Sequence, residues 1–157
     1  MQARGLYHAV LYVRSLQASL AFYRDLLGFT VIGDAFGGRA AALGGADRRT
    51  HHELLLIEVG DAPGPDDAWG GNVGGRRRGL YHLGIKVGDS KDELRAAAAQ
   101  LAAAGVAVEG SSDHTVTWSL YLRDPDGNEV ELYCDNPDVD WRSDPAAVMA
   151  PIKPLRL

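Results

Sequence analysis

Two stretches of the chain repeat one another, "GLYHAVLYV" at residues 5–13 and "GLYHLGIKV" at residues 79–87. Each has the alternating side chains of a half-buried strand, and each is followed by a segment with helical spacing and then by three short strand-like runs. His8 and His82 occupy the same place in the two copies. The repeat therefore predicts an α+β fold made of two βαβββ modules in tandem.

The repeat also divides the chain into segments of one domain. We expect a single domain over residues 1–157, with module one at 5–60, a linker at 61–78, module two at 79–135 and a C-terminal tail at 136–157. The linker is rich in Gly, Pro and Asp, which disfavours regular structure, and a mobile lid is its functional alternative. The tail contains too much proline for a strand or a long helix, so it either wraps around the domain or contacts a second subunit.

Helix-capping signals mark one helix in each module. Ser15 is a candidate N-cap and Gly28 a candidate left-handed C-terminal residue for the first helix. In the second module, Ser90 and Glu93 fit a capping box, and Gly105 follows the last helical position. We expect each helix to cover one face of its module's sheet.

Composition limits the classes of function. The chain has 157 residues, 46% hydrophobic residues and a formal net charge of −5, which indicate a globular protein without the basic surface that nucleic acids require. It has no apolar run of membrane-spanning length and no apolar secretion signal. Its single cysteine, Cys134, cannot form an internal disulfide. We therefore expect a cytoplasmic protein that binds neither nucleic acid nor membrane.

Strand alternation identifies candidate metal ligands. His82 falls on the polar face of its strand, and Glu129 and Glu131 fall on the polar face of the last strand of module two. If the modules pair about a pseudo-twofold axis, His8 and His82 face each other across a concave sheet, and Glu131 completes the set. Two imidazoles and one carboxylate are the facial triad of non-haem Fe(II) sites. As an isolated residue, each histidine is more often an ordinary strand residue than a ligand.

Several motifs together resemble the vicinal oxygen chelate superfamily, which comprises glyoxalases, bleomycin resistance proteins and dioxygenases. Within it, the chain is most similar to the short two-module extradiol dioxygenases of the catechol 2,3-dioxygenase type. The resemblance implies a curved, open mixed sheet around a metal-centred cleft, a cytoplasmic enzyme of aromatic compound catabolism and a homodimer. The motifs are "SLAFYRDLLGF" at 19–29, "HHELLLI" at 51–57, "GLYHLGI" at 79–85, "DH" at 113–114, "SLYLRDPDGNEVELY" at 119–133 and "DNPDVDW" at 135–141.

The resemblance also implies a role for individual residues. The metal triad of the family falls on His8, His82 and Glu131. The catalytic residues fall on three further positions: His52 as acid/base, Tyr121 as hydrogen-bond donor to a substrate hydroxyl, and His114 as the histidine near bound oxygen. The implied cofactor is Fe(II), although Mn(II) accepts similar ligands. The implied reaction is extradiol cleavage of a catechol-type aromatic diol with O₂.

Two other functions remain open at this level. Metal isomerases and lyases similar to glyoxalase use a fourth protein ligand, a carboxylate, at about the place of Leu54. Leucine cannot bind a metal, which disfavours this chemistry, although Glu58 is another possible source of a carboxylate. Drug-sequestering proteins similar to bleomycin resistance proteins lack the metal triad, and the presence of all three candidate ligands here argues against that function.

Overall fold

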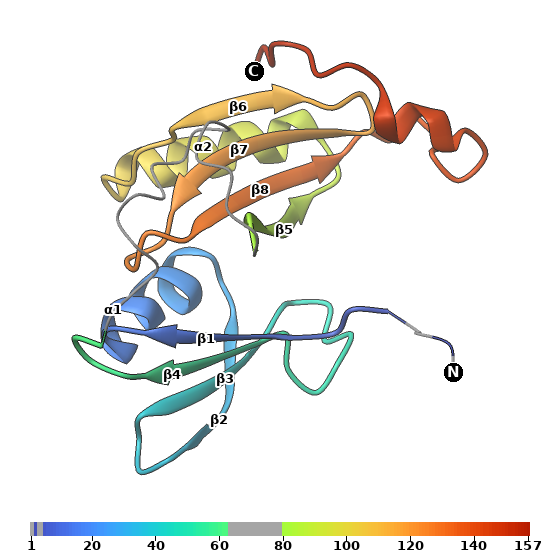
Figure 1. Cartoon of the computed structure of the whole chain (residues 1–157). Helices are drawn as coiled ribbons and strands as arrows, with labels where there is room; N and C mark the ends of the chain where they lie inside the picture. The colour runs from blue at the N-terminus through green and yellow to red at the C-terminus, as the bar shows by residue number, and fades with distance from the viewer. Residues whose placement is uncertain (1, 3–4, 63–79) are drawn as a thin grey trace. The chain divides into compact units, whose positions relative to one another are not determined.

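The computed structural model describes residues 2, 5–62 and 80–157, which form two compact units, Met1–Gly75 and Arg76–Leu157. Each unit contains one four-stranded mixed sheet and one main helix, so the predicted α+β class and the tandem βαβββ modules are confirmed (Figure 1). Of the predicted linker at 61–78, only residues 61 and 62 lie within the described residues. A single sheet enclosing a metal-centred cleft stays a prediction.

The sheet of the first unit has the order β1-β4-β3-β2. Strand β1 pairs in parallel with β4, and the other two pairings are antiparallel. The core of this unit contains Val13 of β1, four of the five residues of β3, and Leu54 and Leu56 of β4. The strands are β1 (Ala9–Val13), β2 (Thr30–Ala35), β3 (Ala40–Gly44) and β4 (Leu54–Glu58).

The helix of the first unit begins where the sequence predicts but changes type. Ser15 is the N-cap of α1 (Leu16–Leu20), since its side chain accepts a hydrogen bond from the backbone N–H of Ala18. The helix continues as the π-helical segment η1 (Ala21–Leu26), which the sequence pattern did not predict. Gly28 then adopts the predicted left-handed conformation, with φ 81°.

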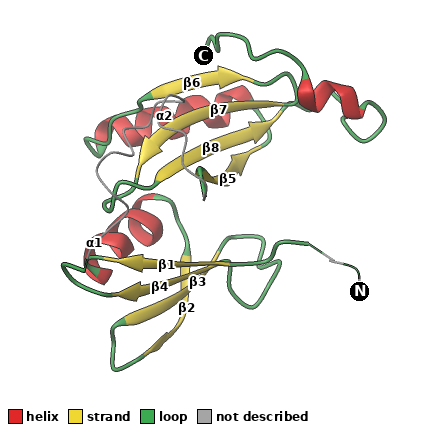
Figure 2. Cartoon of the chain, viewed as in Figure 1, coloured by secondary structure: helices red, strands yellow, loops and turns green. Residues whose placement is uncertain are grey.

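The second unit repeats this plan with a longer helix. Its sheet has the order β5-β8-β7-β6, with β5 and β8 parallel, and α2 lies against one face (Figure 2). Leu94 and Leu101 of α2 are buried against alternate residues of the sheet. Ser90 and Glu93 form the predicted capping box at the start of α2. The elements are β5 (His82–Gly88), α2 (Lys91–Ala103), β6 (Gly110–Asp113), β7 (Thr117–Arg123) and β8 (Glu129–Asp135).

A tight turn between β7 and β8 sets the register of these two strands. The Asp124 carboxylate accepts hydrogen bonds from the backbone N–H groups of Asp126 and Asn128, and Gly127 supplies a positive φ of 84°. Two pairs of polar residues are Cα partners as a consequence, namely Arg123 with Glu129 and Tyr121 with Glu131.

The C-terminal tail folds back onto its own unit. A short 3-10 helix, η2 (Pro145–Met149), is followed by a β-bridge between Asp113 and Lys153, whose backbone N–H and C=O groups are paired in both directions. The tail therefore satisfies backbone groups at the outer edge of β6.

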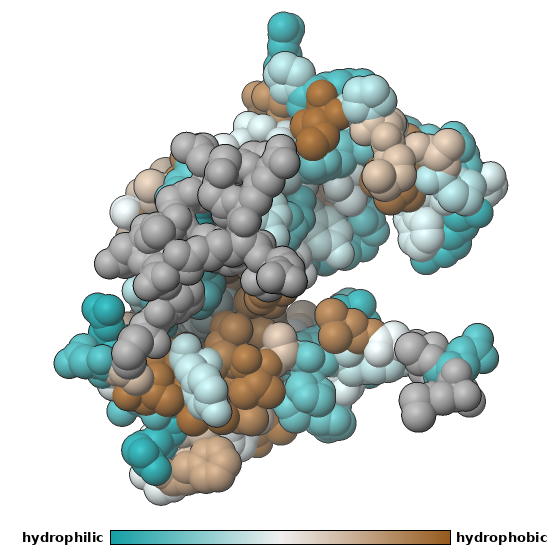
Figure 3. All heavy atoms as spheres, viewed as in Figure 1, coloured by the Kyte–Doolittle hydropathy of each residue, from teal (hydrophilic) through white to brown (hydrophobic). Residues whose placement is uncertain are grey.

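Apolar side chains also reach the surface of the first unit (Figure 3). On β1, Val10 and Tyr12 are exposed on the face opposite the helix, and Tyr12 retains 72% of its accessible surface. No helix in the described parts of the chain is long and apolar enough to cross a membrane.

Candidate functional site

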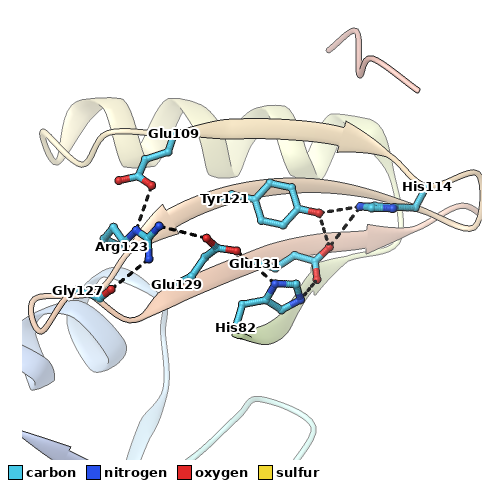
Figure 4. A network of polar contacts seen from close by, with 8 residues as sticks. All are labelled: His82, Glu109, His114, Tyr121, Arg123, Gly127, Glu129 and Glu131. Atoms are coloured by element: carbon cyan, nitrogen blue, oxygen red, sulfur yellow. Dashed lines mark hydrogen bonds and ion pairs between the residues drawn. The ribbon is translucent and has the colours of Figure 1, made fainter. Parts of the chain in front are cut away.

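A polar network covers the face of the second sheet that is opposite α2, and His82 is at its centre (Figure 4). His82 Nε2 lies 3.1 Å from Glu131 Oε2, and His82 Nδ1 lies 3.3 Å from Glu129 Oε1. Gly84 is the Cα partner of Glu131 on β5, and a methyl group there would lie 3.7 Å from Glu131 Oε2. The glycine therefore leaves the space beside the carboxylate open.

Tyr121 and His114 meet on the other side of the same carboxylate. The Tyr121 hydroxyl donates to Glu131 Oε1 at 3.2 Å and lies 2.7 Å from His114 Nε2. When the single hydroxyl proton is donated to Glu131, the Nε2–H tautomer of His114 donates to the tyrosine oxygen. Burial, followed by the Glu131 carboxylate, raises the pKa of Tyr121 to about 12, so its hydroxyl stays protonated at neutral pH.

Arg123 extends the network towards the edge of the sheet. Its guanidinium contacts Glu129 Oε2 at 3.2 Å, Glu109 Oε2 at 3.0 Å and the backbone carbonyl of Gly127 at 3.2 Å. Glu129 is thereby placed between a guanidinium and an imidazole, and only 5% of its side chain is exposed.

A strained turn brings His114 into the network. The next residue, Thr115, has a φ of 72°, and its backbone N–H donates to Asp113 Oδ1 at 2.8 Å. Strand β7 therefore begins only at Thr117. A β-branched residue rarely adopts a positive φ, and such strain is typical of functional sites.

Replacing Thr115 with asparagine should raise the free energy of unfolding by about 1 kcal/mol, because asparagine tolerates the left-handed region better. Chemical denaturation measures the change. The matched control is Thr117→Asn, in the extended strand β7, which should lower the free energy of unfolding. If both variants lost the same free energy of unfolding, the proposed strain at Thr115 would be contradicted.

The remaining predicted histidines lie together in the first unit. The ring centroid of His8 is 4.7 Å from that of His52 and 5.8 Å from that of His51. The Nδ1 atoms of His51 and His52 are 2.6 Å apart, so one of them donates to the other. Burial, followed by the neighbouring His51 and His8, lowers the pKa of His52. The predicted site residues therefore form two groups, one in each unit.

Leu54, which stands at about the place of the fourth ligand of glyoxalase-like enzymes, is part of the core of the first unit. It is buried beside the core residues that face α1. The opposite face of β4 carries Leu55 and Ile57, which cannot bind a metal either. Glu58 Oε2 accepts a hydrogen bond from the backbone N–H of Leu16 at 2.7 Å and so serves the start of α1. No residue of β4 thus offers a free carboxylate to its open face.

Comparison with known proteins shows which family the chain belongs to. Residues 5–132 match the Glyoxalase/Bleomycin resistance protein/Dioxygenase superfamily. The chain belongs to this superfamily. It is 39% identical over 137 residues to a catechol-2,3-dioxygenase from Bacillus subtilis (strain 168), a match that covers 87% of this chain and 44% of that protein. It is 34% identical to biphenyl-2,3-diol 1,2-dioxygenase 3 from Rhodococcus globerulus, over 83% of this chain and 63% of that protein.

The chain thus spans less than two thirds of the length of either of these superfamily relatives. Among solved structures, a glyoxalase/dioxygenase from Nostoc punctiforme has the same fold, with a TM-score of 0.66 and 22% identity over 84% of this chain and 91% of that one. The fold of the superfamily is therefore shown over both modules.

The donor atoms of the second unit suit a superfamily metal. Neutral His82 has one N–H, so it can donate to only one of its two carboxylate neighbours, and its other nitrogen presents a lone pair. A divalent metal held by these two residues would compensate the two lone pairs that face each other between His82 Nε2 and Glu131 Oε2. Among the residues that the structure describes, no three His, Cys, Asp or Glu side chains form a complete metal site.

Two members of the network escaped the sequence analysis. Arg123 received no role, and Glu129 was only placed on the polar face of its strand. A signal was present: the "DPDGN" turn at 124–128 fixes the register of the hairpin and places these opposite charges side by side.

Proposed function

We propose that the protein is an Fe(II)-dependent extradiol dioxygenase that cleaves a catechol-type aromatic diol with O₂. The observation that carries the proposal is the convergence of His82 and Glu131, 3.1 Å apart, with Tyr121 hydrogen-bonded to the same carboxylate. The names of the two dioxygenase relatives, which refer to catechol and to biphenyl-2,3-diol, support this choice of substrate class.

The proposed metal ligands are His8, His82 and Glu131. His8 is the third ligand because it occupies in module one the place that His82 occupies in module two. When bound, Fe(II) supplies a Lewis acid that favours loss of a proton from the diol, together with open coordination positions for the diol and O₂. Mn(II) accepts the same ligand types, so the metal is part of the test.

Tyr121 is assigned to orient the diol. Because its pKa is raised, its hydroxyl keeps its proton and acts as a hydrogen-bond donor to a substrate oxygen. His114 holds the tyrosine oxygen from the other side, at 2.7 Å, and so restricts the direction in which the hydroxyl points. The same imidazole is the group in this unit that can deliver a proton beside the reacting oxygen atoms.

His52 is assigned to acid/base chemistry, as its resemblance to the family histidine implies. It lies beside His8 in the first unit, at a ring-centroid distance of 4.7 Å. The face of β1 opposite the helix carries Val10 and Tyr12, apolar side chains that suit contact with an aromatic ring. Cytoplasmic residence and a homodimer stay predictions.

The decisive experiment is anaerobic reconstitution with Fe(II), followed by addition of a diol under air. Oxygen uptake and near-visible absorbance are recorded with catechol and with 2,3-dihydroxybiphenyl, and Mn(II) is tested in parallel. We expect one O₂ consumed per diol and a yellow ring-opened product.

Other outcomes distinguish the alternatives. Metal binding without oxygen uptake across a panel of diols would contradict the dioxygenase and favour a lyase or isomerase. Absence of metal binding would contradict both enzymes and favour a sequestering protein.

A further inference from the structure

Glu129 is a nearly buried carboxylate outside the metal-ligand motif. Only 5% of its side chain is exposed, and burial of an ionised carboxylate is costly unless a partner compensates it. Arg123 provides that compensation at 3.2 Å from Oε2. The other oxygen, Oε1, faces His82 Nδ1 at 3.3 Å. The carboxylate therefore connects the guanidinium to the imidazole.

The sheet holds this carboxylate in place from both sides. Strand β8 lies between β5 and β7, and Glu129 is the Cα partner of His82 on β5 and of Arg123 on β7. Arg123 is itself held by Glu109 and by the backbone carbonyl of Gly127. The direction of the Glu129 carboxylate is thus determined by strand register and by three contacts of one guanidinium.

The contact between Glu129 and His82 determines which ring nitrogen of His82 carries the proton and which has a free lone pair for a metal. Both ring nitrogens of His82 face a carboxylate, but it is the contact of Nδ1 with Glu129 Oε1, at 3.3 Å, that has hydrogen-bond geometry, so the imidazole proton is favoured on Nδ1. Nε2 is then left with its lone pair, and Nε2 is the atom that faces Glu131. Metal-binding histidines commonly donate their second N–H to a carboxylate in this way, which fixes the ring and increases its basicity.

We propose that Glu129 is a positioning residue that holds His82 in the Nδ1–H tautomer and so presents Nε2 to the metal. The inference rests on the proposed function, because it requires His82 to be a ligand. The competing role is purely structural: in that case, Glu129 only neutralises Arg123.

The test compares Glu129→Gln with Glu109→Gln. Both remove one negative charge next to Arg123, but only Glu129 contacts His82, so Glu109→Gln is the matched control. Because a buried substitution can impair folding, the double variant R123L/E129L, which removes both charges of the pair, is included. Thermal unfolding of the metal-free proteins verifies the fold.

Two readouts apply to each folded variant. Fe(II) affinity is measured anaerobically by competition with a coloured chelator, and the tautomer of His82 is read from ring ¹⁵N shifts of the metal-free protein. We expect Glu129→Gln and R123L/E129L to bind Fe(II) about 10- to 100-fold more weakly and to lose the Nδ1–H preference, while Glu109→Gln retains both properties.

The possible failures are distinguishable. If the unsubstituted protein binds no Fe(II), the proposed function fails and this inference fails with it. If that protein binds Fe(II) and both Glu129 variants keep its affinity and its tautomer, only the positioning role is overturned. Equal losses in Glu109→Gln and Glu129→Gln would also overturn it, because they would assign the effect to Arg123.

Discussion

His82→Ala should eliminate oxygen uptake, with kcat/KM reduced by about a thousandfold or more. The physical reason is the loss of a donor atom 3.1 Å from Glu131, and with it the several kcal/mol of charge stabilisation that a catalytic metal supplies. Metal content after anaerobic reconstitution and dialysis is the first measurement, followed by oxygen uptake with catechol. The variant should contain almost no iron, while its fold is verified by circular dichroism.

His51→Ala is the matched control for this prediction. It is the same substitution, at the one histidine among the five in the sequence that has no predicted role. We expect it to keep its iron content. If His82→Ala retained full iron and His51→Ala lost it, the ligand assignment in module two would be wrong.

Tyr121→Phe should lower kcat/KM by about 10²- to 10³-fold, the usual cost of removing one preorganised hydrogen-bond donor, while iron remains bound. The change removes one oxygen atom, which donates to Glu131 at 3.2 Å and lies 2.7 Å from His114. Because the hydroxyl is protonated up to a pKa of about 12, its loss removes a hydrogen-bond donor and not a base. Steady-state oxygen uptake, together with metal analysis, measures the effect.

Tyr133→Phe provides the comparison on the same sheet. Tyr133 lies two residues beyond Glu131 on β8 and has no predicted role, so the Tyr133→Phe variant should have nearly unchanged activity. Loss of iron from Tyr121→Phe would indicate that the hydroxyl supports the ligand Glu131 and not the substrate. If Tyr121→Phe were as active as Tyr133→Phe, a role for the Tyr121 hydroxyl in turnover would be excluded.

Strand alternation predicted which side chains of module two share the polar face of the sheet. The pattern placed His82, Glu129 and Glu131 on polar faces of their strands, and the structure brings these side chains together opposite α2. The prediction succeeded because each strand has one strictly apolar face, which must be buried against the helix. Side-chain direction is then determined by local sequence alone.

Strand alternation did not place Leu54, which was assigned by resemblance to the glyoxalase type. Strand β4 begins at Leu54, so the preceding His52 is outside the regular strand and alternation cannot be counted from it. The π-helical segment Ala21–Leu26 was also unpredicted, because its apolar spacing fits an ordinary α-helix. The predicted meeting of His8 with His82 depends on the joining of two units, and local patterns do not specify it.

The five-residue turn at 124–128 restricts how this protein can vary. Its length makes Arg123 the neighbour of Glu129 and Tyr121 the neighbour of Glu131. An insertion of one residue would reverse the side-chain direction along one strand and send its carboxylates towards α2, whereas two inserted residues would restore the direction but shift every pair. Natural relatives and engineered variants alike should therefore tolerate changes of residue type in this turn far better than changes in its length.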